Sequence, residues 1–305
     1  MKKLIYLAQW FLRARLFGRK APLQSVIFIT DACNLRCRHC ALAQNEAIGS
    51  AKHKPLDQIL DEMAYCYRLG SRFIDFEGGE PTLWRGLDSH GNQLTVDDLI
   101  DLAKGMGFFS CTITTNAQRP FAGSHADSIW VSLDGLGEAH DDIRGAGAFA
   151  RLEENIAAAA HPALSVNMAI NSRNYQSVEQ TIRYAQQNPH IHQISLNFHT
   201  PYAGTEELFL PWDKRREVID LIIKMKREGY PIMNSVSGLK LMKENKFRRV
   251  CWVTNFIMAD GTRLAECGGS REGVCDRCGF CMAGEMRAVF SFRPDTLMAG
   301  FSLRL

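Results

Sequence analysis

Segments with two different patterns of apolar and polar positions alternate between residue 24 and about residue 200. Short β-branched or aromatic runs have the character of strands, and longer runs with apolar residues every three or four positions predict amphipathic helices. Pro55 suits the first turn of a helix, and Gly70 and Gly105 lie where helices are expected to end. We expect strands at 26–30, 72–77, 109–114, 129–133, 164–170 and 193–198, and helices at 56–69, 95–104, 149–160 and 175–188.

This alternation predicts the α/β fold class. Strands that are separated by helices run parallel and are joined by right-handed crossovers. The six expected repeats over residues 24–205 fit a partial (β/α)6 barrel, which is an open and incomplete form of the TIM barrel. In such barrels the functional groups lie on the loops that follow the strands. The residues after each strand are therefore the first place to look for chemistry.

The pattern changes after residue 205. Residues 212–228 and 239–246 have helical periodicity, whereas the chain beyond residue 250 contains five cysteines, many glycines and little periodicity. We expect residues 206–305 to form a helical linker and a small cysteine-rich domain that depends on bound metal more than on a hydrophobic core. Residues 1–23 are expected to form a separate helix.

Composition limits the possible classes of function. Hydrophobic residues make up 46% and charged residues 23% of the 305, which excludes a disordered chain. The net charge is +3, but residues 1–30 contain six basic and no acidic residues, so the rest of the chain is slightly acidic. This distribution is unlike that of a nucleic-acid-binding protein, and no nucleic acid is expected as a partner.

The basic N-terminal segment is amphipathic. It lacks the cleavage pattern of a signal peptide, and no apolar run is long enough to cross a bilayer. Two interpretations stay open: the helix packs on the barrel, or residues 2–20 lie peripherally on the inner face of an anionic membrane. Its expected apolar face consists of Leu4, Leu7, Ala8, Phe11 and Leu12.

A cysteine cluster directly follows the first expected strand. Cys33, Cys37 and Cys40 have the spacing C-x3-C-x2-C. Three thiolates on one loop suit an iron-sulfur cluster, and three ligands on a four-iron cube leave one iron open to substrate. Zinc is the alternative, although structural zinc usually takes four protein ligands.

Three further motifs follow later strands. After the second strand, Gly78 and Gly79 form a turn that lets the backbone approach a ligand, and the Glu80 carboxylate can accept hydrogen bonds from an ammonium group. Asn116 follows the third strand. The fourth strand leads into a segment that contains Ser132, Asp134 and Arg144, while Asn167 lies in the fifth strand.

Together these motifs resemble those of the radical S-adenosylmethionine (radical SAM) enzymes. The resemblance implies that the open iron binds the methionine part of SAM. An electron from an external donor, such as flavodoxin or ferredoxin, then cleaves SAM to a 5'-deoxyadenosyl radical, which takes hydrogen from a substrate. The implied SAM-binding residues are Gly78, Gly79, Glu80, Asn116, Ser132, Asp134, Arg144 and Asn167. No catalytic residue is assigned.

A second cysteine cluster lies near the C-terminal end. The Asp260-Gly261 pair favours a hairpin that brings Cys251 and Cys267 together. This region resembles the SPASM and twitch domains, which implies one auxiliary 4Fe-4S cluster. The favoured ligands are Cys251, Cys267, Cys278 and Cys281, with Cys275 as the spare or as a replacement. A zinc ribbon is the alternative, and Cys66 and Cys111 are expected to be buried as small apolar residues.

The sequence therefore predicts a radical SAM oxidoreductase or transferase with two 4Fe-4S clusters and SAM as cofactors. The auxiliary cluster would bind substrate or accept an electron from it. Cluster ligands must stay reduced, so we expect a cytoplasmic protein. The substrate is open between a peptide or protein, a lipid or isoprenoid, and a small molecule. A two-cluster electron carrier is the non-enzymatic alternative, although a carrier would not need the motifs at 78–81 and 132–144.

Overall fold

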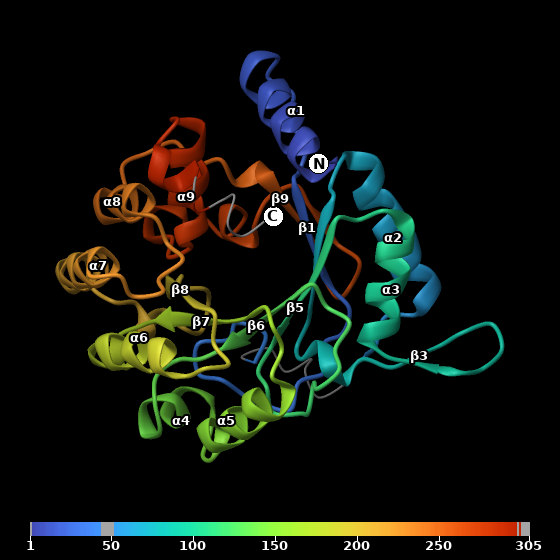
Figure 1. The fold of residues 1–305 in the computed structure, drawn as a ribbon, viewed down its shortest axis with the longest axis horizontal. Helices are drawn as coiled ribbons and strands as arrows, with labels where there is room; N and C mark the ends of the chain where they lie inside the picture. The colour runs from blue at the N-terminus through green and yellow to red at the C-terminus, as the bar shows by residue number, and fades with distance from the viewer. Residues whose placement is uncertain (1, 44–51, 298, 300–305) are drawn as a thin grey trace.

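The computed structural model describes residues 2–43, 52–297 and 299. Its main sheet has eight strands in the order β10-β9-β1-β2-β5-β6-β7-β8, and the last six of these run parallel as a curved, open barrel (Figure 1). This confirms the expected partial barrel. Its strands are β1 (Gln24–Phe28), β2 (Phe73–Glu77), β5 (Ser110–Thr115), β6 (Ser128–Ser132), β7 (Leu164–Ile170) and β8 (Gln193–Phe198).

The expected crossover helices surround this sheet: α2 (Leu56–Leu69), α3 (Val96–Met106), α5 (Ala148–Ala159) and α6 (Val178–Gln187). Gly70 ends α2 in the left-handed conformation, as expected, but α3 continues through Gly105 and ends at Gly107, with φ of 98°. An interior glycine costs a helix only about 1 kcal/mol, so Gly105 does not stop it. Short elements that the pattern did not predict are α4 (Glu138–Arg144) and the hairpin of β3 (Gly86–Leu87) and β4 (Gln93–Leu94).

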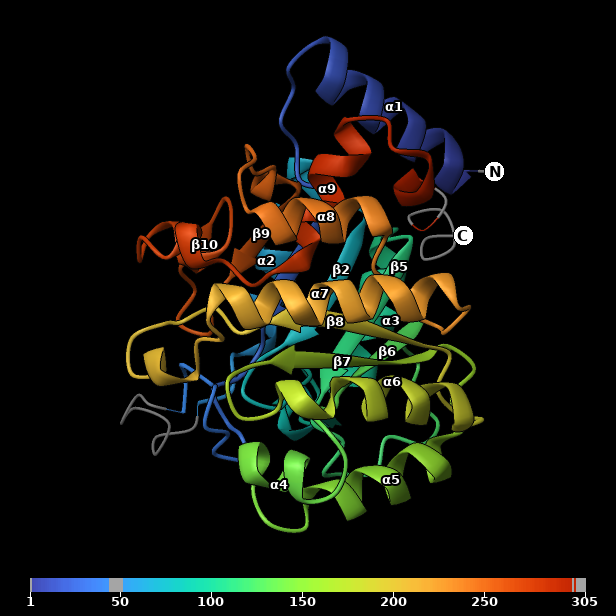
Figure 2. The same ribbon diagram turned by 90° about the vertical axis from the view of Figure 1, so that its left-hand side faces the viewer.

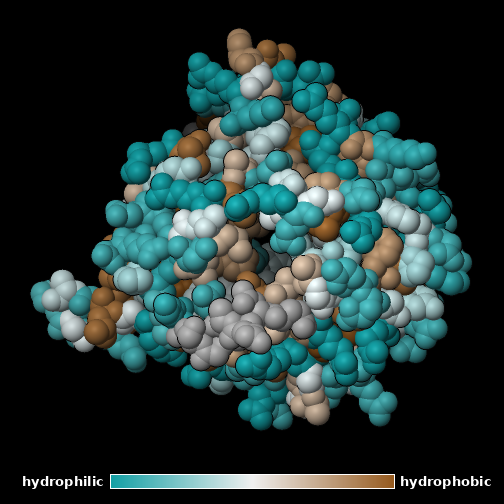
Figure 3. All heavy atoms as spheres, turned by 180° about the vertical axis from the view of Figure 1, so that it is seen from behind, coloured by the Kyte–Doolittle hydropathy of each residue, from teal (hydrophilic) through white to brown (hydrophobic). Residues whose placement is uncertain are grey.

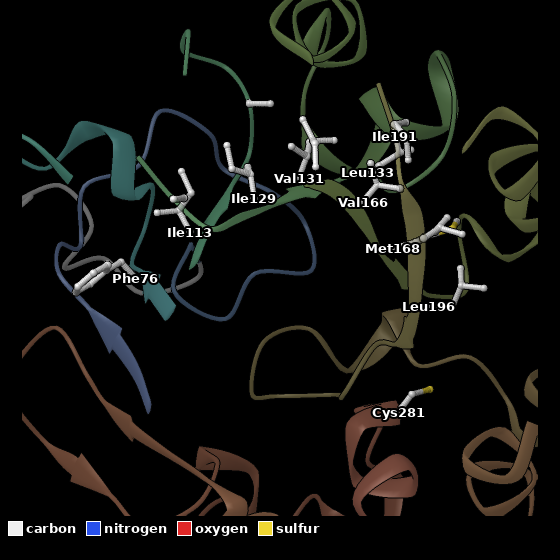
Figure 4. Packing of buried hydrophobic residues seen from close by; sticks show 14 of the residues in the cluster. Phe76, Ile113, Ile129, Val131, Leu133, Val166, Met168, Ile191, Leu196 and Cys281 are labelled. Carbon is white, nitrogen blue, oxygen red and sulfur yellow. The ribbon is translucent and has the colours of Figure 1, made fainter. Parts of the chain in front are cut away.

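The two faces of the barrel sheet differ in polarity. Phe76, Ile113 and Ile129 are neighbours in register and pack outward with the helices (Figure 4). Alternate positions of a strand point to the opposite face, so the inner face of the barrel is rich in polar side chains. These are Asp75, Glu77, Thr112, Thr114, Ser165, Asn167, Ser195 and Asn197. The barrel interior therefore suits a polar occupant.

The C-terminal region is joined to the barrel more closely than expected. Helices α7 (Trp212–Arg227), α8 (Val236–Glu244) and α9 (Cys281–Phe290) follow one another beside α6 (Figure 2). Ile219 and Leu239 belong to the same hydrophobic core as the barrel, so this region does have a core. The divisions at 1–23, 24–205 and 206–305 stay predictions, although the core is continuous across residue 205.

The expected hairpin at Asp260-Gly261 is present. Strands β9 (Thr254–Ile257) and β10 (Arg263–Leu264) pair antiparallel, and Gly261 in their turn has φ of 86°. Unexpectedly, β9 also pairs in parallel with β1 and extends the barrel sheet. Because β9 runs parallel to β1, Cys251 precedes β9 at the end of the sheet opposite to the cysteine loop, which follows β1.

Helix α1 (Lys2–Leu16) packs on the body of the protein and on α9. Trp10 is buried against the rings of Trp252 and Phe290, and its indole nitrogen donates to the Ala21 carbonyl at 2.8 Å. This favours the packing interpretation. Leu7 and Phe11 of the expected face pack beside Trp10, whereas Leu4 and Leu12 are 41% and 50% exposed. No helix in the described part of the chain is long and apolar enough to cross a membrane.

Candidate functional site

The loop that follows β2 lies directly against the loop that carries the first three cysteines. The Gly79 amide donates to the Thr30 carbonyl at 2.8 Å, and the Glu80 amide donates to the Ala32 carbonyl at 2.7 Å. A Cβ atom on Gly78 would lie 2.5 Å from the Thr30 oxygen, and one on Gly79 would lie 2.3 Å from the Ala32 oxygen. Both glycines are therefore required for the contact between the two loops.

Glu80 connects the β2 loop to the end of β5. Its carboxylate is 1% exposed, and Oε1 accepts hydrogen bonds from both the amide and hydroxyl of Thr82 and from the Thr115 hydroxyl. Among the residues that the structure describes, Oε2 accepts only from the backbone amide of Asn116, at 2.7 Å. Burial raises the pKa of Glu80, and these hydrogen bonds oppose that shift. Oε2 keeps the capacity to accept a further hydrogen bond.

Asn116 continues this chain of contacts to the cysteine loop. Its side-chain amide donates to Asn34 Oδ1 at 2.8 Å and lies 3.8 Å from the Cys33 sulfur. The next residue, Ala117, is fully buried with φ of 56°. This is a conformation that glycine adopts at less cost than alanine.

Asp134 and Arg144 approach the same loop from β6 and α4. Arg144 Nε donates to Asp134 Oδ2 at 2.7 Å, and Arg144 Nη1 lies 3.8 Å from the Cys37 sulfur. Burial opposes ionisation of Asp134, but the charge of Arg144 beside it keeps the pKa of that carboxyl below its usual value. The buried ion pair with Asp134 thus holds the guanidinium group of Arg144 against Cys37.

The three cysteines themselves form a tight, partly buried loop. The Cys40 amide donates to the Cys37 carbonyl at 3.1 Å, and burial raises the pKa of the Cys37 thiol to about 11. Burial also raises the pKa of Cys33. Iron binds thiolates, so cluster assembly would remove these protons. All ten cysteines are free thiols, and a loop with three of them fits the donor set of a four-iron cluster.

The remaining expected SAM contacts lie further along the sheet. Ser132 at the end of β6 is in register with Asn167 on β7. Asn167 Oδ1 accepts a hydrogen bond from Asn197 Nδ2 at 2.7 Å, and Asn197 Oδ1 accepts from the Cys281 amide at 2.9 Å. Asn167 therefore has a structural partner that connects it to the start of α9, and its contact with SAM stays a prediction.

Sequence reasoning missed two residues of this site. The hydroxyls of Thr82 and Thr115 both donate to Oε1 of Glu80. Two signals were available in the sequence. Thr82 lies two residues after Glu80, and Thr115 lies directly before Asn116. Neither signal is specific enough alone, because threonines are common in turns and strands.

The second cysteine cluster forms around the β9–β10 hairpin. Cys251 and Cys267 are hydrogen-bonded to each other, and the bond from Cys251 lowers the pKa of the Cys267 thiol to about 6. Burial and the neighbouring Cys267 and Cys278 raise the pKa of Cys275. These four thiols therefore lie near enough to influence one another electrostatically. In the described residues, no three Cys, His, Asp or Glu side chains are grouped closely enough to hold a single metal ion.

Cys281 has a different environment from the other four. It is 1% exposed, begins α9 and belongs to the hydrophobic core (Figure 4). Burial, followed by the charge of Glu285, raises its pKa. We therefore propose Cys251, Cys267, Cys275 and Cys278 as the auxiliary ligands, in place of the set with Cys281. Cys66 and Cys111 are both fully buried in the core, as expected.

The family of the chain can now be stated. A model of the radical SAM superfamily matches residues 27–185, which is more than half of the chain and includes all four motifs. The chain belongs to the radical SAM superfamily. This confirms the resemblance found in the sequence, and it favours an enzyme with a 4Fe-4S cluster and SAM over the electron-carrier alternative.

Curated relatives within the superfamily match only part of the chain. The mycofactocin maturase MftC of Mycobacterium ulcerans is 29% identical over 168 residues, which cover 52% of this chain and 42% of the maturase. A GTP 3',8-cyclase of Stenotrophomonas maltophilia is 28% identical over 184 residues, which cover 57% of this chain and 54% of the cyclase. The chain thus spans about half the length of these relatives.

A solved structure shares the fold over more of the chain. SuiB of Streptococcus suis, bound to its precursor peptide SuiA, superposes with a TM-score of 0.62 at 17% identity. The superposition covers 95% of this chain and 69% of SuiB. Coverage of that extent includes most of residues 206–305, so the likeness of fold extends into the cysteine-rich region.

Replacement of Gly79 by alanine tests the contact between the two loops. The new Cβ would lie 2.3 Å from the backbone oxygen of Ala32, so the cysteine loop must move. We expect the Gly79→Ala variant to lose about half of the iron that the chain takes up under anaerobic reconstitution, because one of two four-iron clusters is lost. The control is Gly105→Ala, where no atom lies within 4 Å. Equal iron in both variants would contradict the account.

A second pair of variants tests the auxiliary ligand set. In a background with Cys33, Cys37 and Cys40 replaced by alanine, we expect Cys275→Ala to abolish the remaining iron. The matched Cys281→Ala variant should retain it, because Cys281 packs in the hydrophobic core. Iron analysis and electron paramagnetic resonance (EPR) of the reduced proteins give the readout. Loss of the cluster in Cys281→Ala and not in Cys275→Ala would restore the set expected from the sequence.

Proposed function

We propose that this chain is a radical SAM enzyme whose cluster is bound by Cys33, Cys37 and Cys40. The observation that carries the proposal is the convergence of the loops after β2, β5 and β6 on the cysteine loop. Hydrogen bonds connect Glu80 and Asn116 to it, and Arg144 lies 3.8 Å from the Cys37 sulfur. An electron carrier would need none of these contacts.

Each of these side chains has a proposed task. When bound, the 4Fe-4S cluster supplies the electron that cleaves SAM to methionine and a 5'-deoxyadenosyl radical. Arg144 has guanidinium N–H groups beyond the one donated to Asp134, and these can bind a carboxylate. Oε2 of Glu80 can accept from an ammonium group, and Asn116 orients the loop beside Cys33. Gly78, Gly79, Ser132 and Asn167 are the other proposed SAM residues.

A peptide is the substrate class that we favour. MftC is named a maturase, and the solved SuiB complex contains a precursor peptide. The inner face of the barrel is consistent with this, because carboxylates and amides such as Asp75, Asn167 and Asn197 can bind peptide groups. A nucleotide is the second candidate, because GTP cyclases are among the relatives.

The proposed auxiliary cluster would bind the substrate or accept an electron from the substrate radical. Four grouped thiols, Cys251, Cys267, Cys275 and Cys278, fit the ligand set of such a cluster. Reduction of the first cluster would require an external donor such as flavodoxin or ferredoxin.

The first test is the cleavage of SAM. After anaerobic reconstitution, the protein with SAM and dithionite should produce 5'-deoxyadenosine, detected by chromatography. Replacing Cys33, Cys37 and Cys40 with alanine should reduce this product to background. The control variant replaces Cys66 and Cys111, which are buried in the core, and should keep the activity. A fully loaded protein that forms no 5'-deoxyadenosine would refute the enzymatic proposal.

The second test distinguishes between the substrate classes. We expect a synthetic peptide, encoded by a short reading frame next to the gene, to increase the rate of 5'-deoxyadenosine formation. Mass spectrometry should show a loss of hydrogen or a new bond in that peptide. GTP is the matched alternative and should have no effect. Stimulation by GTP and not by the peptide would favour the nucleotide class.

We also propose that the outer face of α1 contacts an anionic membrane surface. Its inner face packs through Trp10, yet Leu16 and Phe17 are 67% and 73% exposed. Hydrophobic side chains gather where the end of α1 projects from the molecule (Figure 3). Arg13, Arg15, Arg19 and Lys20 lie within four positions of these two residues, and residues 1–30 contain no acidic residue. Each basic residue near an anionic leaflet contributes about 1 kcal/mol.

Vesicle sedimentation tests this contact. We expect the protein to sediment with phosphatidylserine-containing vesicles, and much less with pure phosphatidylcholine. The double variant Leu16→Ser/Phe17→Ser should lose most of this binding. The control is Leu87→Ser, which removes a side chain of similar exposure, 63%, from the β3–β4 hairpin. If the intact protein does not sediment with anionic vesicles, α1 serves only for packing.

A further inference from the structure

Arg215 is a fully buried cation on α7. It is 0% exposed and occupies the inward stripe of the helix together with Val218, Ile219 and Ile222. Arginine is almost never buried completely unless it is paired with an anion. Its position therefore needs a specific explanation.

No carboxylate among the described residues forms an ion pair with Arg215. The other two buried cations each have one: Lys54 Nζ lies 2.7 Å from Glu62, and Arg144 Nε lies 2.7 Å from Asp134. Arg215 instead donates to the backbone carbonyls of Cys278 at 2.9 Å and His199 at 3.4 Å. Its Nε atom has no hydrogen-bond partner within the described part of the chain. A buried cation without an anion is strongly unfavourable.

The surroundings of the guanidinium are aromatic. The rings of Trp212, Phe198 and Phe209 lie at 4.5, 4.9 and 5.0 Å from its central carbon. These rings stabilise a cation, but they also exclude the water that would screen its charge. Burial lowers the pKa of Arg215 to about 10, which leaves it charged at neutral pH. The thiols of Cys281 and Cys278 are the groups whose negative charge acts on Arg215.

An iron-sulfur cluster at the second cysteine group would supply the missing anion. Four thiolate ligands outweigh the positive charge of an oxidised four-iron cube, so the ligated cluster is anionic. It becomes more anionic when it gains an electron. A nearby fixed cation that water cannot screen stabilises the reduced form more than the oxidised form.

We propose that Arg215 is the counter-charge of the auxiliary cluster and raises its reduction potential. The inference rests on the proposed auxiliary cluster and adds a residue that none of the cysteine motifs contains. Arg215 is a positioning residue in this role, because it contacts the backbone of Cys278 and not the substrate. A higher potential would make the cluster a better acceptor for an electron from the substrate.

The test uses chains with Cys33, Cys37 and Cys40 replaced by alanine, so that only the auxiliary cluster is present. An EPR-monitored titration with dithionite measures the one-electron reduction of that cluster. In Arg215→Met we expect the reduction equilibrium to fall by at least tenfold, which corresponds to 59 mV for one electron. Arg215→Lys keeps the charge and should recover most of the difference.

The matched control is Lys214→Met, which removes the same charge from the neighbouring residue. Lys214 is exposed and paired with Glu217, so its loss should leave the potential unchanged. An Arg215→Met cluster with the potential of the parent would overturn the proposal. A parent chain without iron would instead refute the auxiliary cluster on which the proposal rests, and these two results are clearly different.

The Met variant could also fail to take up iron. Circular dichroism of the iron-free chains then shows whether the variant is folded. A spectrum equal to that of the parent would show that the loss is specific to the cluster, which supports the proposal. A spectrum without native structure would assign Arg215 a purely structural role and overturn it.

Discussion

The proposed cofactor site depends on one close contact, between the loop after β1 and the loop after β2. Gly78 and Gly79 bring the two backbones within hydrogen-bond distance, and Glu80 connects this pair to Asn116. The buried carboxylate is costly unless its acceptor sites are satisfied, so it fixes three loops at once. The cysteines are consequently presented by a rigid support, although they lie in a loop.

A buried arginine lies beside a cysteine of each group, but only one of the two arginines has a carboxylate partner in the described part of the chain. Asp134 neutralises Arg144 beside Cys37, whereas Arg215 beside Cys278 has no such partner among the described residues. The difference suits two different tasks. In the proposed roles, Arg144 is held in place to receive the carboxylate of SAM, and Arg215 is the counter-charge of the auxiliary cluster.

Much of the fold followed from periodicity. The strands at 164–170 and 193–198 and the helix at 56–69 have the expected bounds, because long periodic segments give strong signals. The motifs could be found because parallel strands place their following loops at one end. In contrast, the pairing of β9 with β1 joins residues about 230 positions apart, and no local pattern encodes it.

Arg215 was missed because a charged residue is normally expected to be exposed, although its spacing from Val218 and Ile222 places it on the buried face of α7. Cys275 and Cys281 are equally spaced around Cys278, so only tertiary burial distinguishes them.

The central claim is that the loop with Cys33, Cys37 and Cys40 presents a cluster with one iron open to SAM. Electron-nuclear double resonance of the reduced protein tests it directly, with SAM that carries nitrogen-15 in its amino group. The account predicts a hyperfine coupling between that nitrogen and the cluster, which disappears when the three cysteines are replaced by alanine. A loaded and reduced cluster that shows no such coupling with bound SAM would contradict it.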